Sequence, residues 1–143
     1  MSETWRERAF TAAEAADLAG IRRNVLDMWT IRQPAELFSE KRGYRRWFSP
    51  QDISILAMAH QLERAGITLL TAIACAYEHM QEPPAPDAVF VIEAGRTSCK
   101  AGRFIADRDV ARLHVDKSLI LIPVGQIVAG ITAACADLRR KAA

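Results

Sequence analysis

The 143-residue sequence lacks the features that mark membrane, secreted and disulfide-stabilised proteins. It has no run of roughly 18 to 20 apolar residues, so we expect no membrane span and no membrane partner. Its first ten residues lack the apolar segment of a secretory signal. Three widely spaced cysteines are too few, and odd in number, for a disulfide framework. We therefore expect a soluble cytoplasmic protein with reduced thiols.

Catalytic sequence motifs are also missing. The chain has no P-loop, no GxGxxG, no HExxH and no Ser/His/Asp pattern, and His60, His79 and His114 are scattered. Cys75 and His79 are four residues apart in a predicted helix, but structural zinc takes four ligands. Cys99 lies in a predicted turn with little around it to make it reactive. We expect no enzyme, no catalytic residues, no metal and no cofactor.

Positively charged residues are clustered at two places in the sequence, although the chain as a whole has little net positive charge. The formal net charge is only +2, which does not by itself indicate a nucleic-acid partner. Within residues 41–46, however, four cations stand without an acid, and two more are adjacent at Arg22 and Arg23. The sequence therefore predicts a basic patch on one face.

Proline marks the clearest boundary along the chain. Residues 81–87 read QEPPAPD, which ends any helix and favours an extended linker. Alanine-rich amphipathic stretches precede it and β-branched runs follow it. We predict an α+β chain with a DNA-binding domain at 8–81, a linker at 82–87 and a small α/β module at 88–143.

The first part predicts two short helices joined by a turn. Thr11 is a good N-cap with Glu14 as its capping-box partner, so a helix is expected over residues 12–19. Gly20 suits the left-handed end of that helix, and a second helix is expected over residues 22–29. This pattern is typical of a helix-turn-helix, with Arg22, Arg23 and Asn24 exposed at the start of its second helix.

A hairpin and two more helices are expected next. Residues 30–47 contain Pro34 and Gly43 and lack helical periodicity, which favours a loop or β-hairpin. Ser49 then caps a helix that ends near Gly66, with Asp52 in its first turn where a carboxylate suits the helix dipole. A fourth helix is expected over residues 68–80.

The second part predicts strands followed by a helix. Residues 88–93, 103–107 and 118–124 are the candidate strands, and a helix begins near residue 125. One stripe of that helix is apolar: Ile127, Ile131, Cys135 and Leu138. This stripe is the candidate dimerisation surface of a dimerisation, effector or partner module; the alternative is that it belongs to the chain's own core.

Two stretches of the first half resemble the MerR family of winged helix-turn-helix transcription regulators. They are FTAAEAADLAGIRRNVLDMW at residues 10–29 and GYRRWFSPQDISILAMAHQLERAGITLL at residues 43–70. Their order and spacing match the family's helix-turn-helix, the end of its wing, its third helix and the start of its fourth. By this resemblance Tyr44 and Arg45 match wing positions that touch phosphate, while Trp47 matches an aromatic that packs beneath.

The resemblance implies a homodimer on double-stranded DNA. Its recognition helices would lie in the major groove about 34 to 36 Å apart, and the basic wings would contact phosphates. RNA polymerase or another regulator is a further possible partner. The candidate DNA-binding residues are Arg22, Arg23, Asn24, Lys41, Arg42, Tyr44, Arg45 and Arg46.

The sequence departs from the family at two points, and two alternative functions stay open. Asp27 stands where the family usually has an arginine, and residues 81–87 interrupt the region of the family's dimerising coiled coil. One alternative is an architectural DNA-binding protein of the excisionase or phage-packaging type. The other is a protein-interaction adaptor that has lost DNA binding.

Overall fold

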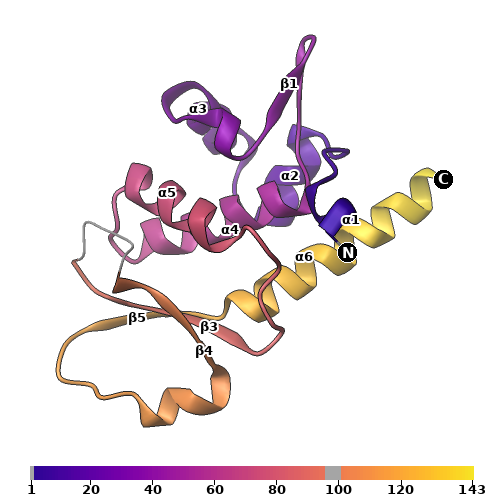
Figure 1. The fold of residues 1–143 in the computed structure, drawn as a ribbon. Helices are drawn as coiled ribbons and strands as arrows, with labels where there is room; N and C mark the ends of the chain where they lie inside the picture. The colour runs from indigo at the N-terminus through magenta and orange to yellow at the C-terminus, as the bar shows by residue number, and fades with distance from the viewer. Residues whose placement is uncertain (1, 96–100) are drawn as a thin grey trace.

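The computed structural model of the protein describes residues 2–95 and 101–143, which form an α+β fold (Figure 1). The helices are α1 (Ser2–Arg6), α2 (Ala12–Ala19), α3 (Arg23–Arg32), α4 (Pro50–Arg64), α5 (Leu69–His79) and α6 (Val124–Ala142), with 3-10 turns η1 (Ala35–Leu37) and η3 (Asp107–Arg112). The strands are β1 (Glu40–Arg42), β2 (Arg45–Trp47), β3 (Ala88–Glu93), β4 (Arg103–Ala106) and β5 (Leu119–Ile122).

Helices α2 and α3 are joined by the predicted glycine turn. The Thr11 hydroxyl accepts from the Glu14 amide at 3.2 Å, and the Glu14 carboxylate accepts from the Thr11 amide at 2.9 Å, so the predicted capping box is confirmed. Gly20 ends α2 with a φ of 76°, a left-handed conformation that other residues adopt at a cost. Helix α3 runs three residues past its predicted end and stops at Gln33, which is extended because Pro34 follows it.

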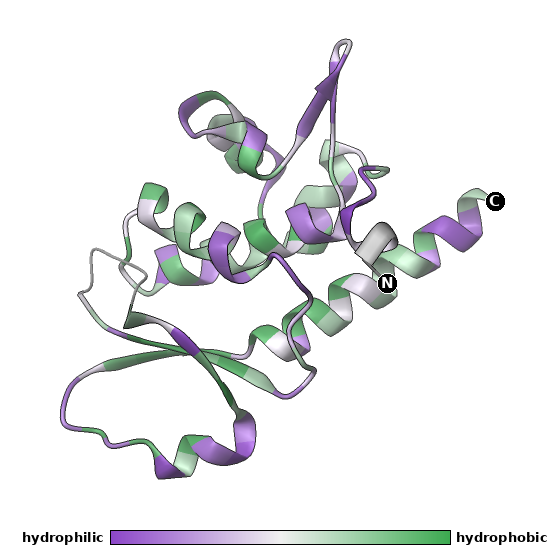
Figure 2. Ribbon diagram, in the orientation of Figure 1, coloured by the Kyte–Doolittle hydropathy of each residue, from purple (hydrophilic) through white to green (hydrophobic). Residues whose placement is uncertain are grey.

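The predicted hairpin is formed by β1 and β2. The strands pair antiparallel, with Lys41 opposite Arg46 and Arg42 opposite Arg45. Gly43, with a φ of 65°, and Tyr44 make the two-residue turn at its tip. At its base, the Phe48 amide donates to the Phe10 carbonyl at 2.9 Å, which ties the hairpin to the segment before α2. Figure 2 shows the hairpin as a hydrophilic projection from the molecule.

Helix α4 is the centre of the fold. It starts after the predicted N-cap residue, Ser49. Asp52 lies in the first turn, as predicted, and also forms a second capping box with Ser49. Helices α1, α2, α5 and α6 all pack against α4, so side chains around most of its circumference are buried. The largest of these are Ile53, Ile55, Leu56, Met58 and Leu62.

The three predicted strands of the second part form an antiparallel sheet in the order β4-β3-β5. The central strand β3 pairs Phe90 with Phe104 on one side and with Ile122 on the other. Phe90 and Ile92 belong to the hydrophobic core that includes the helices. Strand β3 is buried along nearly its whole length, which explains why its sequence is a continuous apolar run rather than an alternating one.

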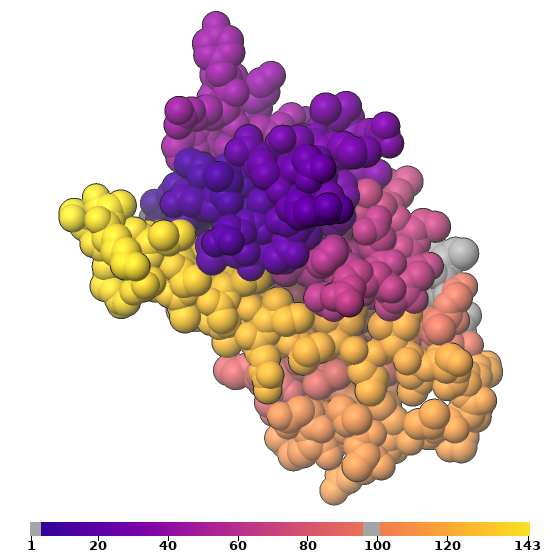
Figure 3. Space-filling model, turned by 180° about the vertical axis from the view of Figure 1, so that it is seen from behind, coloured from indigo at the N-terminus to yellow at the C-terminus, as the bar shows by residue number. Residues whose placement is uncertain are grey.

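Residues on both sides of the proline segment share one hydrophobic core. The core runs from Trp5 to Cys135 and includes residues of α2, α4 and α5 together with β3, β5 and α6. Residues of the segment 88–143 therefore pack against the helices of the first part. Figure 3 shows α6 lying directly against the N-terminal helices, and the hairpin projects from the end of the molecule opposite the orange segment with β4 and η3.

The apolar stripe of α6 lies inside this core. Ile131 is 4% exposed and Cys135 is 0% exposed, and Ile127 and Leu138 are partly buried against the same cluster. Helix α6 packs this face against α4 and α2. The stripe is thus not a free dimerisation surface, because its partner is the chain's own helical layer, and the alternative stated above describes it correctly.

Within the part of the chain that the structure describes, no helix combines the length and apolar character needed to cross a bilayer. Cys99, considered above for redox chemistry, lies outside the described residues.

Candidate nucleic-acid interface

A groove separates α3 from the β1–β2 hairpin, and most of the predicted basic residues line it. Its volume is about 530 Å³. The start of α2 forms its floor, with Thr11, Ala12 and Ala13. Its cationic lining residues are Arg23, Lys41, Arg45 and Arg46, its aromatic ones are Tyr44 and Phe48, and its acidic one is Asp27. We call this the α3–hairpin groove.

The hairpin side of the groove carries charge that is not neutralised. Among residues 2–95 and 101–143, Lys41 and Arg45 take part in no ion pair, and both are exposed. Arg46 donates to the Ser39 hydroxyl at 3.1 Å, which positions its guanidinium without cancelling its charge. Tyr44 is fully exposed at the tip. This side can therefore contact an anion without first losing a carboxylate partner.

The helix side of the groove holds one ion pair. Arg23 Nε lies 3.1 Å from Asp27 Oδ1, one helical turn away, and the two side chains are 56% and 55% exposed. An exposed pair at this spacing contributes about 0.3 to 0.5 kcal/mol, so Arg23 can exchange Asp27 for another acceptor at small cost. The residue that departs from the MerR pattern is thus the partner of a predicted base-reading residue.

Arg42 lies on the other side of the hairpin, away from the groove. Its Nε is 3.0 Å from Glu40 Oε1, and its guanidinium stands 5.1 Å from the centre of the Trp47 ring. It also donates to the Arg8 carbonyl. Arg42 therefore ties the hairpin to the segment before α2, and it does not line the α3–hairpin groove with the other cations of the hairpin. Trp47 is half-buried under it, in agreement with its predicted packing role.

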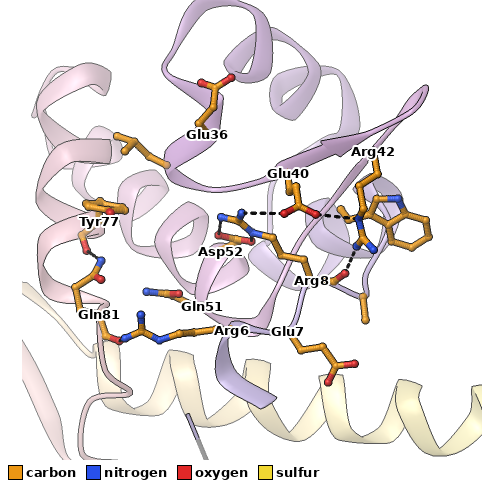
Figure 4. A pocket seen from close by; sticks show the side chains of 13 residues that line it. Arg6, Glu7, Arg8, Glu36, Glu40, Arg42, Gln51, Asp52, Tyr77 and Gln81 are labelled. Carbon is orange, nitrogen blue, oxygen red and sulfur yellow. Dashed lines mark hydrogen bonds and ion pairs between the residues drawn. The ribbon is translucent and has the colours of Figure 1, made fainter. Parts of the chain in front are cut away.

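The cleft on this opposite side has balanced charge (Figure 4). Its volume is about 740 Å³, and its charged lining residues are Arg6, Arg8, Arg42, Glu7, Glu36, Glu40 and Asp52. Basic residues meet carboxylates here at short range, whereas in the α3–hairpin groove the cations outnumber the single acidic lining residue. The two cavities beside the hairpin thus differ in charge: cations are in excess in the α3–hairpin groove and are matched by carboxylates in the opposite cleft.

Arg8 connects the hairpin to the helical core. Its Nε and Nη2 donate to the two carboxylate oxygens of Asp52 at 2.8 and 3.2 Å, and Nη1 lies 3.9 Å from Glu40. The hydrogen bonds to Asp52 raise the pKa of Arg8 above its usual value. Because the Arg8 carbonyl also accepts from Arg42, a single residue joins α4 to both ends of β1. Sequence reasoning missed Arg8, since nothing in its neighbourhood marks it.

The outer face of α3 carries two residues that sequence reasoning also missed. Arg23, Asn24, Asp27, Met28 and Ile31 are all exposed, and their spacing places them on one side of the helix, opposite buried Leu26 and Trp29. Met28 is 46% exposed and Ile31 is 82% exposed. Asn24 lies on this face but does not line the groove. Arg22 is exposed and is the N-cap residue that precedes the first residue of α3.

Cys75 and His79 are close to each other but have other partners. Cys75 Sγ is 3.8 Å from His79 Nδ1, and that nitrogen lies 2.9 Å from the Cys75 carbonyl oxygen. The His79 ring also makes edge contacts with Phe90 and Phe104. Among the described side chains, no group of three or more histidine, cysteine or carboxylate residues is arranged to hold a metal ion.

Comparison with known proteins adds no assignment: no protein-family model matches the chain, and no curated protein matches its sequence.

Proposed function

We propose that this protein binds double-stranded DNA through the α3–hairpin groove, with α3 in the major groove and the hairpin on the phosphates. The observation that carries the proposal is the unequal charge of the two cavities beside the hairpin. Lys41, Arg45 and Arg46 line the same groove as Arg23, whereas the cations of the opposite cleft are matched by carboxylates. A surface that only needed solubility would not require its unpaired cations to gather beside one helix.

The two sides of the groove suit two kinds of DNA contact. Guanidinium and ammonium groups on the hairpin suit phosphate oxygens, which set orientation and register. Residues at the start of α3 suit base edges, with arginine matching guanine and asparagine matching adenine. The rigid attachment of the hairpin through Arg8, Arg42 and the Phe10–Phe48 bridge supports simultaneous contact by both parts.

We further propose that the helix-turn-helix and hairpin act as a winged helix-turn-helix, as the resemblance to the MerR family implies, in a dimeric transcription regulator. The resemblance and the charged groove support this function. A dimer must use a surface other than the α6 stripe, because that stripe is buried. Sedimentation with and without an inverted-repeat duplex would measure the assembly state.

The test is the salt dependence of duplex binding. Each phosphate contact adds about 0.9 to the slope of log Kd against log salt concentration. The variant Arg45→Ala/Arg46→Ala should therefore weaken binding to every duplex and lower the slope by about two units. Fluorescence anisotropy with a labelled duplex, repeated across a salt series, gives both quantities.

A matched control removes the same charge elsewhere. Arg108 and Arg112 are 77% and 84% exposed on η3, remote from the groove in sequence and fold, so Arg108→Ala/Arg112→Ala should leave the slope unchanged. Equal slopes for both double variants would refute the proposed phosphate contacts. Absence of duplex binding by the wild-type protein at low salt would refute DNA binding and favour the adaptor alternative.

A further inference from the structure

We infer that Met28 and Ile31 contact thymine C5-methyl groups, so that the preferred DNA site contains A·T pairs read by the outer face of α3. This inference rests on the proposed function and extends it to the sequence of the target. It starts from the exposure of the two side chains. Ile31 is 82% exposed and Met28 is 46% exposed, although the opposite side of the same helix buries Leu26 and Trp29 completely or nearly so.

Their position argues for DNA as the occupant. Both lie on one face with Arg23 and Asn24, whose side chains can bond to guanine and adenine edges. The same face borders the groove that contains Lys41, Arg45 and Arg46. A partner that binds over Ile31 therefore also lies next to concentrated positive charge. This combination suits a polyanion that carries apolar groups on its surface.

The chemistry of the major groove supplies such points. Each A·T pair presents the adenine N6 and N7 atoms and, on the same groove floor, the thymine C5-methyl group. An asparagine that bonds to adenine therefore brings its helix neighbours close to a methyl group. Asn24 and Met28 are one helical turn apart, and so are Asp27 and Ile31.

The length of the face sets the size of the site. Arg23 and Ile31 are eight residues apart, or about 12 Å at 1.5 Å per residue. This distance covers three to four base steps of about 3.4 Å each. A half-site with a guanine contacted by Arg23, followed within about four base pairs by thymines, is the expected pattern.

Replacement of thymine by uracil tests the inference directly, because uracil lacks only the methyl group. The preferred site is first selected from a random duplex library, and each thymine in it is then replaced in turn. Loss of one contacted methyl group should weaken binding about fourfold, which corresponds to about 0.8 kcal/mol. Binding is measured by fluorescence anisotropy for wild-type protein, Met28→Ala and Ile31→Ala.

Combining the protein variants with the thymine-to-uracil changes shows which side chain contacts which methyl group. Ile31→Ala should bind the thymine site about as weakly as wild type binds the uracil site, and should no longer distinguish the two duplexes. Val115 is 72% exposed on the segment between η3 and β5, so Val115→Ala is a matched removal of exposed apolar surface and should keep full discrimination. Since Ile31 and Val115 are both exposed, neither Ile31→Ala nor Val115→Ala should disturb folding.

The outcomes separate this inference from the proposed function. Duplex binding that is insensitive to uracil, or uracil sensitivity that Met28→Ala and Ile31→Ala both preserve, would overturn the inference and leave DNA binding in place. Failure of the wild-type protein to bind any duplex would overturn both.

Discussion

Arg8 offers the sharpest test of how the hairpin is held, through the variant Arg8→Ala. The Asp52 carboxylate is 1% exposed, and besides the Ser49 amide at 2.8 Å its hydrogen-bond donors are the two nitrogens of Arg8. Alanine at position 8 leaves a buried negative charge with its capping bond alone. It also removes the cation that lies between Glu40 and Asp52.

The size of the effect follows from burial. Removal of one partner of a fully buried ion pair costs about 3 to 5 kcal/mol. The Arg8 side chain is 30% exposed, so water can reach the vacated position and solvate part of the Asp52 charge. We therefore expect a loss of about 2 to 3 kcal/mol in the free energy of unfolding, a large share of the 5 to 15 kcal/mol typical of a domain.

Urea unfolding followed by circular dichroism measures this loss. Arg8→Lys should fall between wild type and Arg8→Ala, because lysine keeps the charge but not the two-pronged geometry. Arg8→Ala/Asp52→Asn should be more stable than Arg8→Ala, because the amide does not need a cation. The control is exposed Arg64, at the end of α4, whose change to alanine should cost less than about 0.5 kcal/mol. If Arg8→Ala costs no more than Arg64→Ala, the reasoning is refuted.

Three further changes have definite expected outcomes. Asp27→Asn should tighten binding to all duplexes about two- to fivefold by freeing Arg23 and removing a charge that repels phosphate, as anisotropy at fixed salt would show. Gly43→Ala should cost about 1 to 2 kcal/mol in urea unfolding, because the φ of 65° disfavours any side chain; an unchanged midpoint would contradict the turn geometry. Burial raises the pKa of the Cys135 thiol to about 11 from an ordinary value of 9.0, against the opposing effect of Arg139. The unfolded chain then loses this proton first, so stability should fall as pH rises from about 9 to 11, and Cys135→Ala should show a shallower fall over that window.

Much of the local structure could be predicted because its causes lie within a few residues of one another. The Thr11–Glu14 capping box and the Ser49 cap each act within three residues, and they place the starts of α2 and α4. Gly43 at the hairpin tip is equally local. For the same reason the sequence indicated that Lys41, Arg42, Arg45 and Arg46 lie on one loop or hairpin.

The assignment of those residues to the two cavities beside the hairpin required the tertiary structure. Arg42 and Arg45 are cross-strand neighbours of the same residue type, yet Arg42 joins Glu40 and Trp47 while Arg45 lines the α3–hairpin groove. The contact that ties Arg42 in place involves the carbonyl of Arg8, 34 residues away in the chain. No local pattern encodes which distant group will stand beside a given side chain.

Helix α6 shows the same division between sequence and tertiary structure. By itself the sequence determined an amphipathic helix with Ile131 and Cys135 on its apolar stripe, because a period of 3.6 residues depends only on the helix. The partner of that stripe was decided by the fold, which brings α6 against α4 and α2. An apolar stripe that forms a dimer interface and one that packs into the chain's own core have the same periodicity, because both bury apolar side chains away from water. Only the path of the chain decides which of the two forms.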